Sequence, residues 1–183
     1  MKKLLIIDTF GLIFRAYHAY PMMNTADGKP TNAVFGVLSM LLSCIDKFQP
    51  DYILCSLESD SPTFRHVKLP EYKGNRKEID PELGSQIGEI INVIQSLGIK
   101  MLFKDGYEAD DVIGSYAHKN MDKFDLIEII TGDRDLLQLL APNIQVFMPG
   151  KSFADLIQYD RHKFKEKFGI ELEDYVFYKS LVG

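Results

Sequence analysis

The sequence has little cysteine, no long apolar run and no excess of basic residues. Its two cysteines, Cys44 and Cys55, lie in apolar stretches, which predicts packed thiols, no disulfide framework and a reducing, cytoplasmic compartment. No apolar stretch approaches the roughly 20 residues that cross a bilayer. The N-terminal run Leu4–Ile7 is too short for a signal peptide and ends in an acid. We therefore expect no membrane partner and no small-molecule cofactor.

The bulk composition is that of one ordinary globular domain. The chain has 183 residues, of which 46% are hydrophobic and 26% charged, enough for a full hydrophobic core. A net charge of −5 disfavours a nucleic-acid binder. However, the charges are strongly segregated along the chain, so the total conceals their distribution.

Apolar strand-like runs alternate with segments of helical periodicity. Strands are expected at Leu4–Asp8, Tyr52–Leu57, Ile99–Phe103, Leu126–Thr131 and Ile144–Phe147. Helices are expected at Thr31–Phe48, Pro81–Leu97, Ala109–Lys119, Arg134–Leu140 and Asp160–Phe168, with another beginning in Leu172–Val182. The polar segment Glu58–Asp80 is expected to be a loop. This alternation predicts an α/β fold with a mostly parallel central sheet and helices on both faces.

Acidic residues follow four of the expected strands. They are Asp8, Glu58, the group Asp105 with Glu108–Asp111, and the pair Asp133 and Asp135. Because ligands of such sheets bind beyond the carboxyl ends of the strands, we expect these carboxylates to converge. Helix capping accounts for one or two of the acids, because negative charge is favourable in a first turn, but not for all of them.

Converging carboxylates must take up protons or bind cations. Oxygen ligands favour Mg²⁺ or Mn²⁺, and no Cys/His pair has zinc-ligand spacing. Two such ions form the usual clamp for phosphodiester hydrolysis. The sequence therefore predicts a divalent-metal site at this edge of the sheet.

A basic segment follows Glu58 closely. Residues 63–77 contain five Lys or Arg, one acid, and the aromatics Phe64 and Tyr72. A solvated loop is one interpretation. Cations beside a metal site also suit a phosphate backbone, and interleaved aromatics suit stacking on exposed bases.

Several short motifs, taken together and in order, carry a resemblance. They are Ile7-Asp8, Phe14–Ala19, Thr31–Gly36, Thr63–His66, Glu71–Arg76, Gly106–Asp111, Thr131–Gln138 and Lys179–Gly183. With these motifs the chain resembles the 5′-nuclease domain of bacterial DNA polymerase I and the related bacterial and phage flap endonucleases. The resemblance implies a three-layer, PIN-like fold over residues 1–183, with a mobile basic arch at about 58–80.

The resemblance also implies roles for particular residues. The metal ligands would be Asp8, Glu108, Asp110, Asp111, Asp133 and Asp135. In the arch, Lys73 and Arg76 would contact the scissile phosphate and act in catalysis, with Lys77 also binding nucleic acid. Arg15 and Arg65 match further phosphate contacts, and Tyr72 is a candidate stacking residue. The implied cofactor is a pair of Mg²⁺ or Mn²⁺ ions, and the implied partners are DNA with a 5′ flap or 5′ end and a downstream polymerase domain.

The sequence departs from the family pattern in two places. Glu58 stands where the family usually has Asp, and we retain it as an expected metal ligand. In the family, the equivalent of Leu181–Gly183 runs into Gly-Asp-x-x-Asp, which supplies two more ligands and precedes a helix-hairpin region. We therefore expect an incomplete second metal site. The alternatives are a 5′-3′ exonuclease and flap endonuclease, a truncated fold that binds metal and DNA or a partner without cutting, and a PIN-like ribonuclease.

Overall fold

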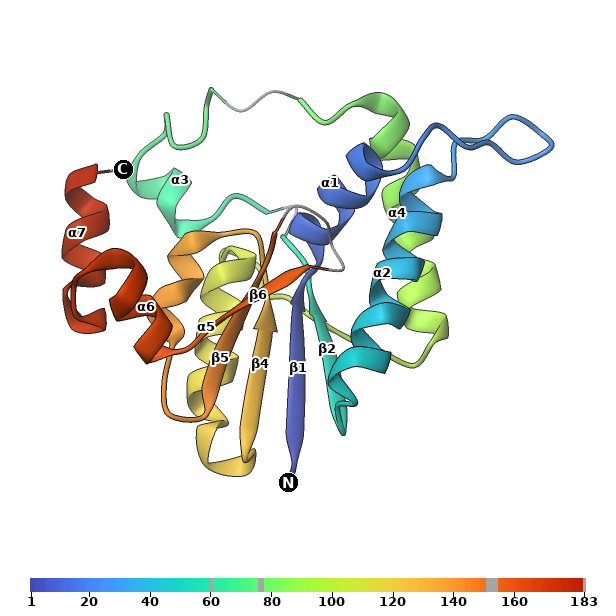
Figure 1. The fold of residues 1–183 in the computed structure, drawn as a ribbon. Helices are drawn as coiled ribbons and strands as arrows, with labels where there is room; N and C mark the ends of the chain where they lie inside the picture. The colour runs from blue at the N-terminus through green and yellow to red at the C-terminus, as the bar shows by residue number, and fades with distance from the viewer. Residues whose placement is uncertain (60, 76–77, 151–154, 183) are drawn as a thin grey trace.

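The chain folds around a twisted six-stranded sheet (Figure 1). The structure is a computed structural model and describes residues 1–59, 61–75, 78–150 and 155–182. The strand order is β3-β2-β1-β4-β5-β6. The strands are β1 (Lys3–Asp8), β2 (Tyr52–Ser56), β3 (Lys100–Leu102), β4 (Leu126–Ile130), β5 (Ile144–Pro149) and β6 (Leu156–Tyr159).

All neighbouring strands pair in parallel except β5 and β6, which are antiparallel. The predicted mostly parallel sheet is thus confirmed, and each of its five expected strands is present with ends shifted by a few residues at most. The central strands are continuous apolar runs, as in Leu4–Ile7, because both faces of a parallel sheet are buried.

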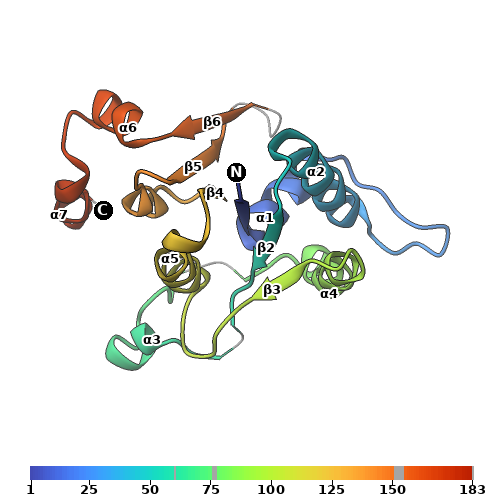
Figure 2. The same ribbon diagram turned by 90° about the horizontal axis from the view of Figure 1, so that it is seen from below.

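Helices cover both faces of the sheet (Figure 2). One core contains residues of α1 (Thr9–Ala19), α2 (Asn32–Phe48) and α4 (Pro81–Ser96), and the other contains residues of α5, α6 and α7. The remaining helices are α3 (Phe64–Lys68), α5 (Ala109–Lys119), α6 (Arg161–Phe168) and α7 (Tyr175–Val182), and the 3-10 turns are η1 (Met121–Lys123), η2 (Arg134–Leu139) and η3 (Leu172–Asp174). The expected three-layer, PIN-like arrangement is confirmed.

Helices α1 and α2 approach closely at Gly36. A Cβ built there would lie 2.7 Å from the Tyr20 ring and 2.9 Å from the Ala16 Cβ. Only glycine fits at this spacing, since methyl and ring carbons pack at about 3.5–4.0 Å. The contact packs α1, which begins directly after Asp8, against α2.

The structure corrects the expected loop at Glu58–Asp80. The short helix α3 lies within it, begun by Thr63, whose hydroxyl and backbone N–H both contact His66 Nδ1 (2.8 and 3.2 Å). The amide of Phe64 donates to Gly106 O (3.0 Å), which attaches α3 to the turn before α5. Residues 61–75 therefore lie above the carboxyl edge of the sheet (Figure 1).

The strands β3, β2, β1 and β4 are consecutive neighbours, and their carboxyl ends share one edge. The chain leaves β1 for β2 on one side of it and reaches β4 on the other, so this edge includes a topological switch point, where open α/β sheets bind ligands. Among the described helices, none has the length and apolar character required to cross a membrane.

Candidate functional site

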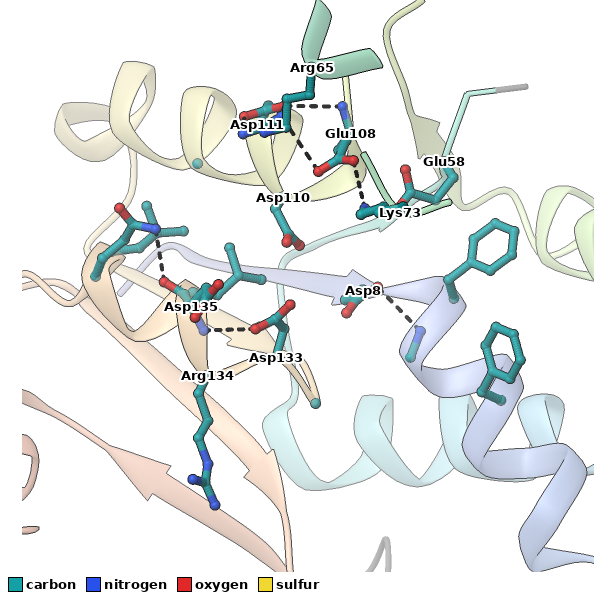
Figure 3. Close-up of a pocket in the computed structure, with 18 of the residues that line it drawn as sticks. Asp8, Glu58, Arg65, Lys73, Glu108, Asp110, Asp111, Asp133, Arg134 and Asp135 are labelled. Carbon is teal, nitrogen blue, oxygen red and sulfur yellow. Dashed lines mark hydrogen bonds and ion pairs between the residues drawn. The ribbon is translucent and has the colours of Figure 1, made fainter. Parts of the chain in front are cut away.

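A cleft of about 1330 Å³ opens at the switch point (Figure 3). Side chains from β1, the β2 end, α5 and the η2 turn line it, and residues of the 61–75 segment form one wall. All seven predicted metal ligands lie on this cleft: Asp8, Glu58, Glu108, Asp110, Asp111, Asp133 and Asp135. The topology thus brings together acids that are up to 127 residues apart (135 − 8) in the chain.

Asp8 and Asp133 are positioned by one buried hydroxyl. Thr131 Oγ1 donates to Asp8 Oδ2 (2.9 Å) and accepts from the Asp133 amide (2.9 Å). The Gly11 amide at the start of α1 donates to the other oxygen, Asp8 Oδ1 (3.3 Å). Burial raises the pKa of Asp8, and the negative charge of Asp133 adds to the shift.

Asp110 lies at the centre of the acidic group (Figure 3). Its pKa is raised to about 7, first by burial and then by the negative charges of Asp133, Asp8, Glu58 and Glu108, in that order. Carboxylates at this spacing repel one another, and the repulsion is relieved by a proton or by a cation. This first-turn residue of α5 therefore has a charge that the surrounding protein leaves uncompensated.

Glu58 reaches the same group from the end of β2. Its Oε2 accepts a hydrogen bond from the Ala109 amide (3.3 Å), at the N-terminus of α5. A free helix N-terminal amide is satisfied in this way. The longer glutamate side chain thus spans from β2 to α5.

Two cations hold the remaining carboxylates of α5. Arg65 donates to both oxygens of Asp111 (2.6 and 2.9 Å) and lies 3.5 Å from Glu108 Oε2. Lys73 Nζ lies 2.6 Å from Glu108 Oε1, and the Tyr72 hydroxyl donates to Glu108 Oε2 (3.2 Å). We name Arg65, Tyr72 and Lys73 the basic wall. The hydrogen bonds from Arg65 lower the pKa of Asp111.

Lys73 has an unusual backbone conformation. Its φ is +59°, in the left-handed region that favours glycine, although the residue carries a long side chain. Such a conformation costs a non-glycine residue about 1–2 kcal/mol. The turn directs the ammonium group into the cleft and toward Glu108 (Figure 3).

The other predicted site residues are placed less centrally. Asp135 faces Lys179 of α7, with its Oδ1 3.2 Å from the Nζ. Arg15 donates to Gly150 O (3.0 Å), at the end of β5. Arg76 and Lys77, predicted to contact nucleic acid, lie outside the described residues.

The carboxylate oxygens of the cleft are the type of ligand that a hard divalent cation prefers, although they do not form a complete coordination shell. Across residues 1–59, 61–75, 78–150 and 155–182, no three acids, histidines or cysteines are grouped tightly enough to hold an ion as they stand. The carboxylates around Asp110 repel one another. Glu108 and Asp111 are also paired with Lys73 and Arg65. Both features are consistent with carboxylates that stand apart. Mg²⁺ needs few direct carboxylates and keeps several waters, so the oxygen donors facing the cleft suffice chemically.

Sequence reasoning missed several residues of the cleft. Thr131 was noted only as part of a motif, yet it links two of the acids. Lys179 and the rings of Phe10 and Phe14 also line the cleft. A hydroxyl directly after a buried strand and two residues before an acid is the local signal that points to Thr131. Lys179 also belongs to one of the motifs, but no local signal indicates that it lies at the cleft.

The sheet order, the acidic cleft at its switch point and the basic wall define a PIN-like α/β protein. The profile of the 5′-3′ exonuclease, N-terminal resolvase-like domain matches residues 3–169. The chain belongs to this family.

Two curated relatives and one solved structure illustrate the similarity. DNA polymerase I of Bacillus caldotenax is 34% identical over 182 residues, which cover 100% of this chain and 21% of that protein. The 5′-3′ exonuclease of Aquifex aeolicus is 35% identical over 183 residues, covering 100% and 62%. The phage T5 D15 protein, co-crystallized with metal ions, has the same fold, with a TM-score of 0.78 at 21% identity over 100% of this chain and 67% of that one. The chain thus spans about a fifth of the polymerase and under two thirds of the exonuclease.

Proposed function

We propose that this chain is the metal-binding part of a divalent-metal-dependent 5′-3′ exonuclease and flap endonuclease that hydrolyses DNA phosphodiester bonds in replication and repair. The observation that carries the proposal is the cleft itself, where carboxylates from four neighbouring strand ends face a basic wall. Membership of the 5′-3′ exonuclease family supports the reaction class. The metal ions named for the T5 D15 protein support a divalent cofactor.

The proposed cofactor is Mg²⁺ or Mn²⁺, with two ions in the complete family site. Asp8, Asp110 and Asp133 would hold the ion at the centre of the cleft, because their charges meet around Asp110. Glu58, Glu108, Asp111 and Asp135 would complete the direct or water-mediated ligands. A bound divalent ion supplies an activated water and neutralises charge on the leaving oxygen.

The protein side chains do the rest of the work. Lys73 and Arg65 present donors to the phosphate oxygens, and the planar fork of Arg65 suits bidentate contacts. Tyr72 offers a ring for a base at the cleft mouth. In the proposal Arg76 and Lys77 also bind the nucleic acid, and Arg15 contributes from α1. In the proposal, the Thr131 hydroxyl fixes the relative positions of Asp8 and Asp133 through its two hydrogen bonds.

The proposed substrate is DNA with a 5′ flap or 5′ end. A fused polymerase domain, as in the DNA polymerase I relatives, is a proposed partner of the same polypeptide.

A cytoplasmic location also belongs to the proposal. Cys44 and Cys55 are free and buried, and burial raises their thiol pKa values to about 12 and about 11, which suits inert thiols in a reducing compartment.

The test is cleavage of an end-labelled 5′-flap DNA by the purified chain in Mg²⁺, in Mn²⁺ and in chelator. We expect metal-dependent cleavage near the flap junction. Asp133→Asn should reduce the rate by more than about 100-fold, the upper end of the cost of outer-sphere changes at metal sites.

Asp122→Asn is the matched control, because Asp122 is an exposed acid in η1, next to the amino end of β4 and remote from the cleft. It should leave cleavage and its metal dependence unchanged. Metal-dependent melting without cleavage would show that this chain binds metal but is catalytically incomplete, and would remove the proposal that its own carboxylates suffice for cleavage. Equal cleavage by wild type and Asp133→Asn would remove the metal assignment.

A further inference from the structure

Lys73 and Arg65 already occupy the carboxylates assigned to the metal. Both oxygens of Glu108 are engaged, Oε1 by Lys73 and Oε2 by the Tyr72 hydroxyl with Arg65 nearby. Both oxygens of Asp111 are engaged by Arg65. Glu108 is nearly buried, with 8% of its side chain exposed. These are therefore close contacts at the base of the cleft rather than solvated surface pairs.

A divalent ion added to this arrangement would meet the basic wall. A Mg²⁺–oxygen bond is about 2.1 Å long, so an ion on Glu108 Oε1 would share that oxygen with the Lys73 ammonium group, whose nitrogen lies 2.6 Å from it. A carboxylate oxygen can accept two partners, but two cations on one oxygen repel each other in a partly buried site. The ion and Lys73 therefore compete for Glu108, and binding of one weakens binding of the other.

The same cations are the ones proposed to bind phosphate. While Lys73 and Arg65 pair with Glu108 and Asp111, the N–H groups that make these contacts point at protein carboxylates and not at a substrate. Lys73 makes this ion pair from the left-handed region of backbone space, at φ +59°.

We propose that a divalent ion and the cations of the basic wall replace one another as partners of Glu108 and Asp111. Without metal, Lys73 and Arg65 neutralise these carboxylates and close the cleft against substrate. Binding of the ion displaces them, and the freed ammonium and guanidinium groups then receive the phosphate of the nucleic acid. Phosphate binding thus becomes available only when the metal is in place. The inference rests on the proposed function and adds a regulatory step to it.

The first measurement is amide hydrogen exchange over residues 64–75 in chelator, Mg²⁺ and Mn²⁺. Amides of this segment are protected by short-range bonds, such as Leu69 to Arg65 O (2.8 Å) and Tyr72 to Leu69 O (2.9 Å). If the ion displaces the basic wall, saturating metal should speed exchange here. Exchange in β1 and β4 should slow or stay the same. Slower or unchanged exchange in 64–75 on metal binding overturns the proposal.

The second measurement is Mn²⁺ affinity by calorimetry. Coupling between sites is reciprocal, so a cation that metal displaces must weaken metal binding. Lys73→Met should therefore bind Mn²⁺ about 5-fold more tightly or better. Lys68→Met is the matched control, because it removes the same charge from the same segment while Lys68 Nζ lies over the Phe64 ring (5.7 Å). Equal effects of the two variants would indicate a general charge effect and overturn the exchange.

The outcomes separate this inference from the proposed function. Wild type that binds no Mn²⁺ in calorimetry overturns both. Wild type whose Mn²⁺ binding is lost in Asp133→Asn, but whose residues 64–75 do not respond, overturns the exchange alone.

Discussion

Asp110 is the residue of the cleft whose negative charge is least compensated by its surroundings. It is part of the first turn of α5, where a negative charge is favourable for the helix. Burial and four neighbouring carboxylates nevertheless raise its pKa to about 7. A residue whose charge destabilises the fold in this way is typical of a functional site.

This leads to a prediction about stability in chelator. The unfolded-state pKa of Asp110 is near 3.8 and the folded-state pKa near 7, so the folded state binds more protons between them and stability falls as pH rises across that window. Asp110→Asn should flatten this fall and raise the free energy of unfolding at pH 8 by about 1–3 kcal/mol. Urea titrations at several pH values measure it. Loss of stability in the variant at pH 8 would contradict the charge argument.

Gln86 shows how one side chain can join elements. It is 1% exposed, its Oε1 accepts from the Ala33 amide (2.8 Å), and its Nε2 donates to Asn32 Oδ1 (3.0 Å). Asn32 in turn donates to Tyr17 O (3.1 Å). A residue of α4 thereby accepts a hydrogen bond from a free amide at the N-terminus of α2. Through Asn32 it also links α2 to α1, the helix that follows Asp8.

Gln86→Leu should destabilise the protein by about 2–3 kcal/mol, because it removes the hydrogen-bond partner of the Ala33 amide and of the Asn32 side-chain oxygen in a buried place. Gln95→Leu, at an exposed position of the same helix, controls for the change in helix composition and should cost little. Denaturant unfolding of both variants gives the comparison. Equal midpoints would show that this cross-helix cap contributes nothing.

The elements differ in how far their own sequence determines them. Helix α5 and the strand ends with their acids could be predicted, because periodicity, caps and acid positions are local signals. Helix α1 gave no such signal, since apolar Phe10 and Phe14 line the cleft while other apolar residues face the core. Strand β6 exists through antiparallel pairing with β5, and the cap from Gln86 acts across 53 residues. Such contacts depend on the tertiary fold.

At the scale of the whole molecule, the well-packed sheet places several carboxylates of like charge close together at one edge. The strand ends could be predicted to meet at one edge, but not that Lys73 and Arg65 would pair with Glu108 and Asp111. That pairing depends on where residues 61–75 pack, which sequence spacing does not determine. The net charge of −5 likewise conceals an acidic cleft beside a basic wall.

Metal should therefore stabilise the whole fold. An ion that binds only the native state adds about 2.7 kcal/mol at 100 times its dissociation constant. We expect the Tm to rise with Mg²⁺ or Mn²⁺ in wild type and to rise much less in Asp133→Asn. Sodium chloride at matched ionic strength separates binding from screening, and an equal shift in that salt would argue against a specific ion.

The left-handed backbone of Lys73 has a consequence for engineering. A redesign for heat tolerance alone would relax this turn by choosing glycine at position 73, and would replace Asp110 with a neutral residue. Each change is a local improvement by the rules of stable proteins. Together they would give a more stable scaffold without the lysine proposed to bind phosphate and the aspartate proposed as the central metal ligand, so positions 73 and 110 should be held fixed when this chain is optimised.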